Sequence, residues 1–305
     1  MSGAPAIQVT GLRRKMGEVQ AVDGMDFEVH KGELFGLVGP DGAGKTTTIR
    51  LLAGLLDAHG GAVRVLGEDP TRGTVRERVG LMPQQYSLYG DLSVAENLRF
   101  FGHLFCIPGP LYKARAERLL HITRLHTFAD RRADALSGGM YKKLALACAL
   151  LHEPEVLLLD EPTNGVDPVS RRELWELLYE FVGHGMAVLV STPYMDEAAR
   201  CHRVGLVFAG QVLDMGRPGE LVRGLGLSAF LVEGGQRDAV LARVEGHPLV
   251  RAASPAGPRL RIVLDPKDEA SLAQDLVPTG AHLVPATLDF EDLYLARMAE
   301  REARA

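Results

Sequence analysis

The stretch GPDGAGKTT, from Gly39 to Thr47, decides the fold. It matches the pattern G-x-x-x-x-G-K-[ST], in which a glycine-rich backbone wraps the phosphates of a nucleotide. The apolar run Leu34–Val38 before it predicts a buried strand, and the residues from Lys45 to about Leu56 predict a helix. Strand, loop and helix in this order are the context that the motif requires. The sequence therefore predicts a phosphate-binding loop at the end of a buried strand.

The loop offers two kinds of phosphate contact. Its backbone N–H groups and the positive end of the helix dipole both favour bound phosphate. Lys45 would reach the β- and γ-phosphates and assist catalysis, and the Thr46 hydroxyl would coordinate Mg²⁺. A plain glycine-rich turn is the alternative, and the flanking strand and helix weigh against it. The residues expected to contact ATP are Gly39, Pro40, Asp41, Gly42, Ala43, Gly44, Lys45, Thr46 and Thr47.

A second motif, VLLLDEP from Val156 to Pro162, ends a buried apolar run with two carboxylates. Phosphate-loop enzymes place an acid beside the magnesium ion in this way, so Asp160 is expected to contact the metal. Glu161 would lie on the other side of the strand end and polarise the attacking water as a general base. Alone, such a run also marks ordinary strand ends. After a phosphate loop it indicates a hydrolytic site.

The remaining pattern predicts a parallel sheet with a helical insert. Strand and helix alternate, and the strands are apolar throughout, which is typical of a parallel sheet covered on both faces. From Ser93 to about Leu151 helical patterns replace the strand signals. The predicted elements outside the first motif are the strands Ile7–Leu12, Ala21–Val29, Glu155–Asp160 and Met186–Ser191 and the helix Ser170–Val182.

The chain changes character near Gly224 to Leu227. Beyond this point the predicted order is β-α-β-β-α-β followed by a final helix from Asp289, which is compatible with a small ferredoxin-like α+β domain. We therefore expect a nucleotide-binding domain over residues 1–225, with a helical subdomain at about 88–152, and an accessory domain over residues 226–305.

Composition narrows the function classes. The chain of 305 residues has a net charge of −5, which argues against a nucleic-acid partner bound through a basic surface. Three scattered cysteines without metal spacing fit a reducing cytoplasm. The N-terminus lacks the pattern of a secretory signal, and the longest apolar stretches fall far below the ~20 residues of a membrane span. Any membrane role is expected to act through a partner.

Three further motifs resemble the ATP-binding-cassette (ABC) ATPases. LSGGM, from Leu136 to Met140, looks like the signature of that family, whose serine and second glycine reach the γ-phosphate held by a facing subunit; here these are Ser137 and Gly139. MPQQ resembles the loop whose first glutamine, Gln84, links magnesium and water to the membrane partner. NGVD resembles the loop whose aspartate, Asp167, braces the dimer interface. The resemblance covers about residues 5 to 222.

Three positions depart from the family pattern. The aromatic residue that stacks on adenine is replaced by Met16, whose thioether is still able to lie against a ring. The last signature residue is Met140 rather than glutamine, a change expected to be mild. Pro193 stands where the family has a switch histidine that touches the γ-phosphate, and proline offers neither a side-chain donor nor a backbone N–H. Either a neighbouring residue or water compensates, or this half-site is slow.

The resemblance implies a RecA-like phosphate-loop NTPase core with an antiparallel β subdomain. It also implies an ATP- and Mg²⁺-dependent ATPase subunit that drives a separate integral-membrane permease, of the drug or lipid exporter type. Such a subunit lies on the cytoplasmic face of the membrane. It works as a homodimer, or as a heterodimer with a second, histidine-bearing ATPase domain. Two alternatives remain open: an ABC ATPase acting on ribosomes or DNA, and a nucleotide-binding regulator that hydrolyses little or nothing.

Overall fold

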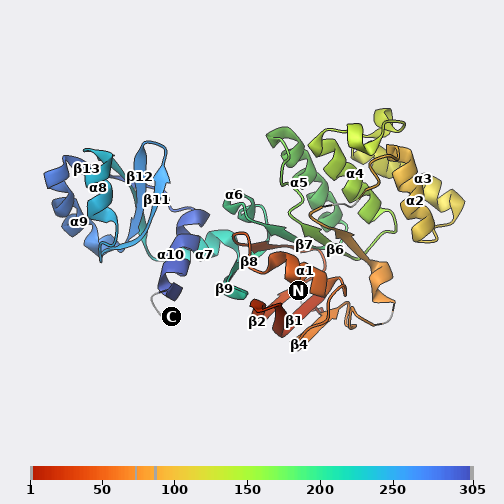
Figure 1. The fold of residues 1–305 in the computed structure, drawn as a ribbon, viewed down its shortest axis with the longest axis horizontal. Helices are drawn as coiled ribbons and strands as arrows, with labels where there is room; N and C mark the ends of the chain where they lie inside the picture. Colours follow the sequence, from red (N-terminus) through yellow and green to blue (C-terminus); the bar gives the residue numbers. More distant parts are fainter. Residues whose placement is uncertain (1–2, 73, 86–87, 303–305) are drawn as a thin grey trace. The chain divides into compact units, whose positions relative to one another are not determined.

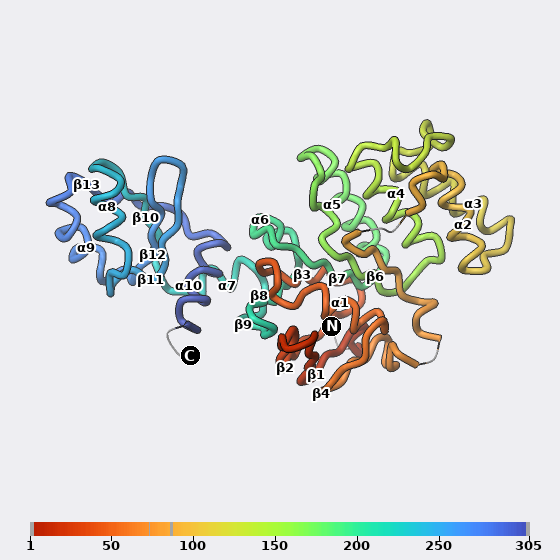
Figure 2. The backbone as a smooth tube through the Cα atoms, in the orientation of Figure 1, coloured from red at the N-terminus to blue at the C-terminus, as the bar shows by residue number. Residues whose placement is uncertain are grey.

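A computed structural model describes residues 3–72, 74–85 and 88–302 and divides into two compact units. Unit 1 comprises Met1–Tyr194 and Cys201–Val212, and unit 2 comprises Met195–Arg200 and Leu213–Ala305. Figures 1 and 2 colour the chain from red at its start in unit 1 to blue at its end in unit 2. Each unit contains its own sheet and its own buried apolar cluster.

The centre of unit 1 is a six-stranded sheet in the order β5-β6-β7-β3-β8-β9. Neighbouring strands from β5 to β8 run parallel, and every residue of β3, β6 and β7 is buried. The predicted parallel sheet is thus confirmed. The strands β5, β8 and β9 carry no earlier prediction. The six strands are β3 Leu34–Val38, β5 Val79–Met82, β6 Val156–Asp160, β7 Ala187–Thr192, β8 Arg203–Phe208 and β9 Gln211–Gly216.

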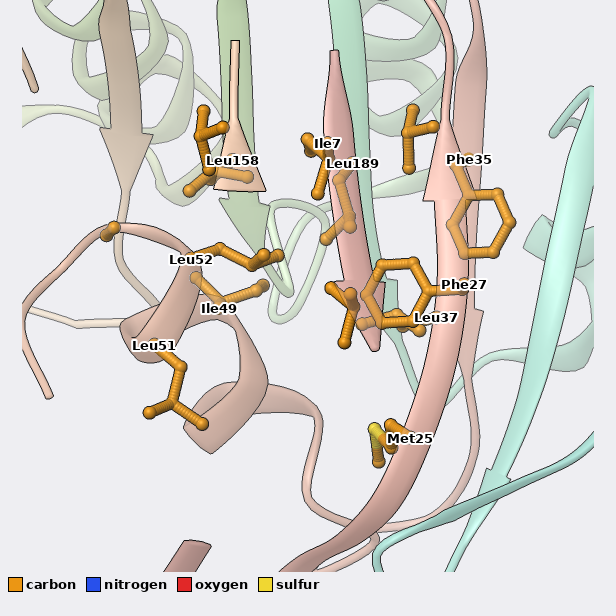
Figure 3. Packing of buried hydrophobic residues seen from close by; sticks show 14 of the residues in the cluster. Ile7, Met25, Phe27, Phe35, Leu37, Ile49, Leu51, Leu52, Leu158 and Leu189 are labelled. Carbon is orange, nitrogen blue, oxygen red and sulfur yellow. The ribbon is translucent and has the colours of Figure 1, made fainter. Parts of the chain in front are cut away.

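A smaller antiparallel sheet in the order β2-β1-β4 packs over α1 (Lys45–Leu52). Its strands are β1 Ile7–Met16, β2 Val19–Val29 and β4 Gly60–Val65. Figure 3 shows Ile49 and Leu52 of α1 pointing toward the strands of the central sheet, in one buried cluster with side chains from β1 and β2. The helix ends before the predicted Leu56, because Gly54 adopts φ +65°, a left-handed conformation that closes a helix.

Helices cover the rest of unit 1. The predicted helical insert is present as α2 (Val94–Leu104), α3 (Gly109–Ile122) and α4 (Gly138–Leu150). A reciprocal capping box between Ser93 and Glu96 fixes the start of α2. Pro168–Gly183 forms α5, which lies between β6 and β7 in the chain. Short 3₁₀ segments occur at Val75–Arg78, His126–Phe128 and Ala133–Ala135.

Unit 2 contains a four-stranded antiparallel sheet in the order β11-β12-β10-β13. Because β10 and β11 run the same way with β12 between them, the first three strands form a split βαβ arrangement, as expected for a ferredoxin-like domain. The elements are α6 Met195–Ala198, α7 Pro218–Gly224, β10 Ser228–Gly234, α8 Arg237–Val244, β11 Val250–Ala256, β12 Arg259–Leu264, α9 Glu269–Leu276, β13 Ala281–Ala286 and α10 Phe290–Glu302, with 3₁₀ segments Pro266–Asp268 and Val277–Thr279.

One buried ion pair supports unit 2. Arg261 of β12 donates from Nε to Oδ1 of Asp292 at 2.8 Å, and a second guanidinium nitrogen lies 2.5 Å from Oδ2. Asp292 belongs to α10 and is 1% exposed, whereas the Arg261 side chain is 18% exposed, so a buried carboxylate and a partly buried guanidinium attach the helix to the sheet. The Asp292 hydrogen bond raises the pKa of Arg261 above its usual range. Among the described residues, no helix combines the length and apolar character needed to cross a membrane.

Candidate functional site

The loop Gly39–Gly44 joins β3 to α1 and turns sharply at Gly44, which has φ +105°. A side chain at Gly44 would place its Cβ 2.2 Å from the carbonyl oxygen of Ala21, so the turn requires glycine. Lys45 follows at the first position of α1 and is 3% exposed. Its Nζ donates to the carbonyl oxygens of Gly39 at 2.8 Å and Pro40 at 2.9 Å. The lysine therefore lies under the loop, at the N-terminus of the helix.

The end of β6 brings a carboxylate to the first turn of α1. The Thr46 hydroxyl donates to Oδ1 of Asp160 at 3.1 Å, and the Ser191 hydroxyl of β7 donates to the same oxygen at 2.6 Å. Asp160 is 3% exposed. A hydroxyl and a carboxylate oxygen side by side are the hard donors that Mg²⁺ prefers. No group of three His, Cys, Asp or Glu among the described residues would hold a metal by itself, so a cation here would need further ligands from the nucleotide.

Glu161 is held in an unusual backbone conformation. Its φ is +49°, in the left-handed region that a glutamate seldom adopts, and its side chain is buried. The Glu161 N–H donates to both the carbonyl and the hydroxyl oxygen of Ser191, at 3.2 and 3.1 Å. Strained backbone of this kind persists where the surroundings over-determine it, and it clusters at functional sites.

The Glu161 carboxylate has a different environment at each oxygen. Oε2 accepts the Gln84 side-chain amide at 2.7 Å and the Asn164 side-chain amide at 3.1 Å. Oε1 faces the Lys45 ammonium at 3.8 Å. Two N–H donors thus fix the orientation of the carboxylate and leave Oε1 to act toward a bound group. Oε1 is therefore the oxygen with the geometry of a base.

One buried lysine, Lys45, and one half-buried lysine, Lys142, share this cluster of carboxylates. Burial lowers the pKa of Lys45 below its usual range, and the carboxylates of Glu161, Asp41 and Asp160 partly offset that effect. Burial also lowers the pKa of Lys142, with Glu161 and Asp160 opposing it. Lys142 lies on α4, and its Nζ donates to the main-chain oxygen of Gln84 at 3.1 Å. This contact joins the helix of the LSGGM motif to the Gln84 loop.

Ser137 and Gly139 form the start of α4, outside the hydrogen-bonded group around Lys45. Ser137 caps the helix by accepting the Met140 N–H at 3.3 Å, and its exposed position leaves the N-terminus of α4 open. Gly139 faces α5, where an added Cβ would lie 2.3 Å from Oγ of Ser170. Asp167 caps α5 by accepting the N–H groups of Val169 and Ser170.

Two of the three departures from the family pattern, Met16 and Pro193, lie at the ends of strands, and the third, Met140, lies in the first turn of α4. Met16 is the last residue of β1 and is 40% exposed, and it takes no part in the hydrogen-bonded group. Pro193 directly follows β7, so the proline stands next to Ser191 and Thr192 at the site. Sequence reasoning assigned no role to Asn164, Ser191 or Lys142. Asn164 belongs to the NGVD loop and Ser191 ends a predicted strand, so the sequence indicates that these two residues lie near the site. The sequence does not indicate which groups they contact.

Comparison with known proteins agrees with this geometry. A family model described as ABC transporter matches residues 22–164. The chain is 43% identical over 273 residues to the Probable multidrug ABC transporter ATP-binding protein YbhF of Escherichia coli, covering 87% of this chain and 46% of that relative, so it spans about half of YbhF. It is 40% identical over 259 residues to the Nod factor export ATP-binding protein I of Paraburkholderia xenovorans, covering 84% of each chain. The Nod factor export ATP-binding protein I of Ralstonia nicotianae is 36% identical over 313 residues, covering 100% of this chain and 97% of that relative.

Solved structures give the same result for the fold. An ATP-binding subunit of an ABC transporter superposes with a TM-score of 0.66 at 28% identity, covering 72% of this chain and 93% of the other. A dimeric ATP-binding cassette in a post-hydrolysis state, bound to ADP and Pi, gives 0.62 at 25% identity, covering 69% and 98%. The fold is that of a phosphate-loop NTPase, and the chain belongs to the ATP-binding proteins of the ABC transporter family.

Proposed function

We propose that the chain binds ATP with Mg²⁺ and hydrolyses it as the ATPase subunit of an ABC exporter. The observation that supports this most directly is the single cluster formed by Lys45, Thr46, Gln84, Asp160 and Glu161, which come from three separate segments. Residues 1–225, with a helical subdomain at about 88–152, would form the nucleotide-binding domain, and residues 226–305 an accessory domain. Met16 would lie against adenine.

The loop residues Gly39 to Thr47 would hold the triphosphate through backbone N–H groups and the Lys45 ammonium. Thr46, Asp160 and the side-chain oxygen of Gln84 would hold Mg²⁺, because the Gln84 nitrogen already donates to Glu161. The ion would neutralise charge that develops on the phosphate oxygens. These ligands are all oxygens, as a magnesium site requires.

Hydrolysis would use Glu161 as the base. Oε1 accepts a proton from a water molecule as the water oxygen bonds to the γ-phosphorus. The bond between that phosphorus and the β–γ bridging oxygen breaks, and the electron pair leaves with ADP. Phosphate and ADP are the products, and the proton on Glu161 is released to solvent before the next turnover.

Two cassettes would face each other, with Ser137 and Gly139 of one contacting the γ-phosphate held by the other. The open N-terminus of α4 suits an anion for this purpose. The partner is a second copy of the chain or a different ATPase domain with histidine at the position of Pro193. Turnover of the purified chain and of Pro193→His separates these cases. A marked acceleration by histidine favours the mixed dimer, and a brisk wild-type rate favours the homodimer.

The membrane permease would dock on an apolar groove of about 720 Å³ between the central sheet and the helical insert. Two leucines on its rim are strongly exposed, Leu55 at 58% and Leu104 at 60%. A neighbouring cavity shares Leu55, Leu81 and Pro83 with the groove and extends to Gln84 and Asp160. A short amphipathic helix of the permease in this groove would therefore press against the loop that carries Gln84. The chain would then lie at the cytoplasmic face of the membrane.

The test is Mg²⁺-dependent ATP turnover by the purified chain, alone and with its co-expressed permease. We expect turnover that Glu161→Gln abolishes while ATP affinity is retained, and stimulation by an exported drug- or lipid-like substrate. Tight ATP binding without turnover, with or without permease, would instead identify a regulatory cassette. That outcome would overturn the proposal of an ATPase.

A further inference from the structure

Tyr194 lies directly after Pro193 and is fixed on three sides. Its backbone N–H donates to the Thr192 hydroxyl at 3.1 Å. The guanidinium of Arg171 lies over its ring, 4.7 Å from the centroid, in cation–π geometry. Its hydroxyl donates to Oδ1 of Asn164 at 3.3 Å. The ring and the hydroxyl therefore have a defined direction, toward the loop that follows Glu161.

Asn164 carries this contact to Glu161. Its side-chain nitrogen donates to Oε2 of Glu161 at 3.1 Å, while its side-chain oxygen accepts the Tyr194 hydroxyl. A side-chain amide presents a donor at one end and an acceptor at the other. The Glu161 carboxylate, which only accepts, sets the donor end of the amide toward Oε2, and the tyrosine hydroxyl binds the other end and restrains the position of the amide. If the amide turned over, its oxygen would face Oε2, and that contact would be repulsive.

The same segment also contacts the phosphate loop. The carbonyl oxygen of Thr192 accepts the Gly39 N–H at 3.2 Å, and the Ser191 hydroxyl donates to Asp160 at 2.6 Å. The residues from Ser191 to Tyr194 therefore contact the loop, the metal-side carboxylate and, through Asn164, the base. Pro193 contributes no side-chain donor within this segment.

We propose that Tyr194 is a positioning residue for ATP hydrolysis, which aligns Glu161 through Asn164. This inference rests on the proposed function, because it acts through Glu161 as the base. Tyr194 restrains the position of the Asn164 amide, and the amide, together with Gln84, holds Oε2 so that Oε1 faces the water. The tyrosine does not touch the reacting atoms.

The hydroxyl is removed without other change by Tyr194→Phe, which keeps the ring under Arg171. We expect kcat to fall about threefold, because the lost hydrogen bond joins neutral groups and is long for a hydroxyl donor. The affinity for ATP should stay within twofold of wild type, since the tyrosine holds the base and not the phosphates. Asn164→Ala should lower kcat by about tenfold or more, because it removes a hydrogen bond to a charged group.

A double-mutant cycle separates positioning from general support of the fold. If Tyr194 acts through Asn164, the variant with both changes has the kcat of Asn164→Ala alone. Tyr112→Phe, which removes a hydroxyl from α3 elsewhere in unit 1, serves as the matched control and should leave basal kcat unchanged. Additive losses in the cycle, or a Tyr194→Phe enzyme with wild-type kcat, would overturn the inference.

The same series distinguishes failure of the inference from failure of the proposed function. If Glu161→Gln abolishes turnover and Tyr194→Phe matches wild type, the positioning role is wrong and the ATPase assignment stands. If Glu161→Gln retains wild-type turnover, Glu161 is not the base, and both the mechanism and the positioning role are refuted. Equal thermal unfolding midpoints for wild type and Tyr194→Phe would show that a change in kcat is not a loss of folded protein.

Discussion

Lys45→Met tests the proposed nucleotide site most directly. The lysine is buried, and methionine has a similar length, so the change removes the charge and the donors without opening a large cavity. The ammonium donates to Gly39 and Pro40 and lies 3.8 Å from Glu161. Binding of ATP would therefore exchange or share existing contacts rather than add contacts to an unpaired group.

The expected loss of ATP affinity in Lys45→Met follows from this exchange of contacts. A hydrogen bond to a charged group contributes about 1.5–3 kcal/mol, which corresponds to about 10- to 150-fold in Kd. Because the Lys45 ammonium has protein partners beforehand, we expect the lower end, about tenfold weaker binding of Mg²⁺–ATP. The stability of the free chain should change much less, since the burial that lowers the pKa of Lys45 already disfavours its charged form.

The assay is isothermal titration calorimetry with Mg²⁺ and a non-hydrolysable ATP analogue. Lys31→Met provides the matched control, because Lys31 is also paired with a glutamate, Glu155 at 2.7 Å, but is 59% exposed and lies outside the site. The control should bind as wild type does. An affinity for Lys45→Met within twofold of wild type would refute the assignment of Gly39–Thr47 as the phosphate loop.

Three further predictions concern packing and charge. Gly139→Ala should lower ATP turnover and destabilise the chain by about 1–3 kcal/mol in urea unfolding, despite the helix preference for alanine, because its Cβ would overlap the Ser170 side chain. Wild-type stability would contradict this close packing. Arg261→Met should cost about 3–5 kcal/mol by leaving the buried Asp292 carboxylate without its cation, and a second change of Asp292 to Leu should recover most of that loss. Equal losses in the single and double variants would contradict this pairing. Burial lowers the pKa of His152, so as pH falls through about 6.5 the unfolded chain binds a proton that the folded chain does not, and stability decreases. Between pH 7.5 and pH 5.5 the midpoint of thermal unfolding should therefore decrease less for His152→Gln than for wild type. Equal decreases in the two midpoints would contradict this role of His152.

The sequence predicted the parts of the site that depend on local pattern. The phosphate loop needs a strand before it and a helix after it, and the carboxylates Asp160 and Glu161 end an apolar run, so position along the chain was enough. The contacts of Asn164 and Lys142 depend on how separate segments fold together. Asn164 reaches back to Glu161 across a turn, and Lys142 reaches Gln84 from another helix. No spacing in the sequence encodes these distances.

The secondary structure likewise divides into elements that a local sequence pattern predicts and elements that no such pattern marks. In unit 2 the predicted order β-α-β-β-α-β with a final helix from Asp289 matches the elements from β10 to α10, because turn residues separate short segments of clear pattern. In unit 1 the strands β4, β5, β8 and β9 were missed, although β8 contains four consecutive buried residues. β5 has four residues, and β4 and β9 are largely half-exposed, so neither alternation nor a continuous apolar run marks them.

The left-handed backbone at Glu161 has a consequence for engineering. A side chain in that conformation costs of order 1 kcal/mol, which glycine would not incur. A library of variants selected for heat resistance alone would therefore favour glycine at position 161 and lose the base. Directed evolution of a hardier cassette should accordingly select for turnover at every round, since thermal tolerance and activity make opposing demands on this residue.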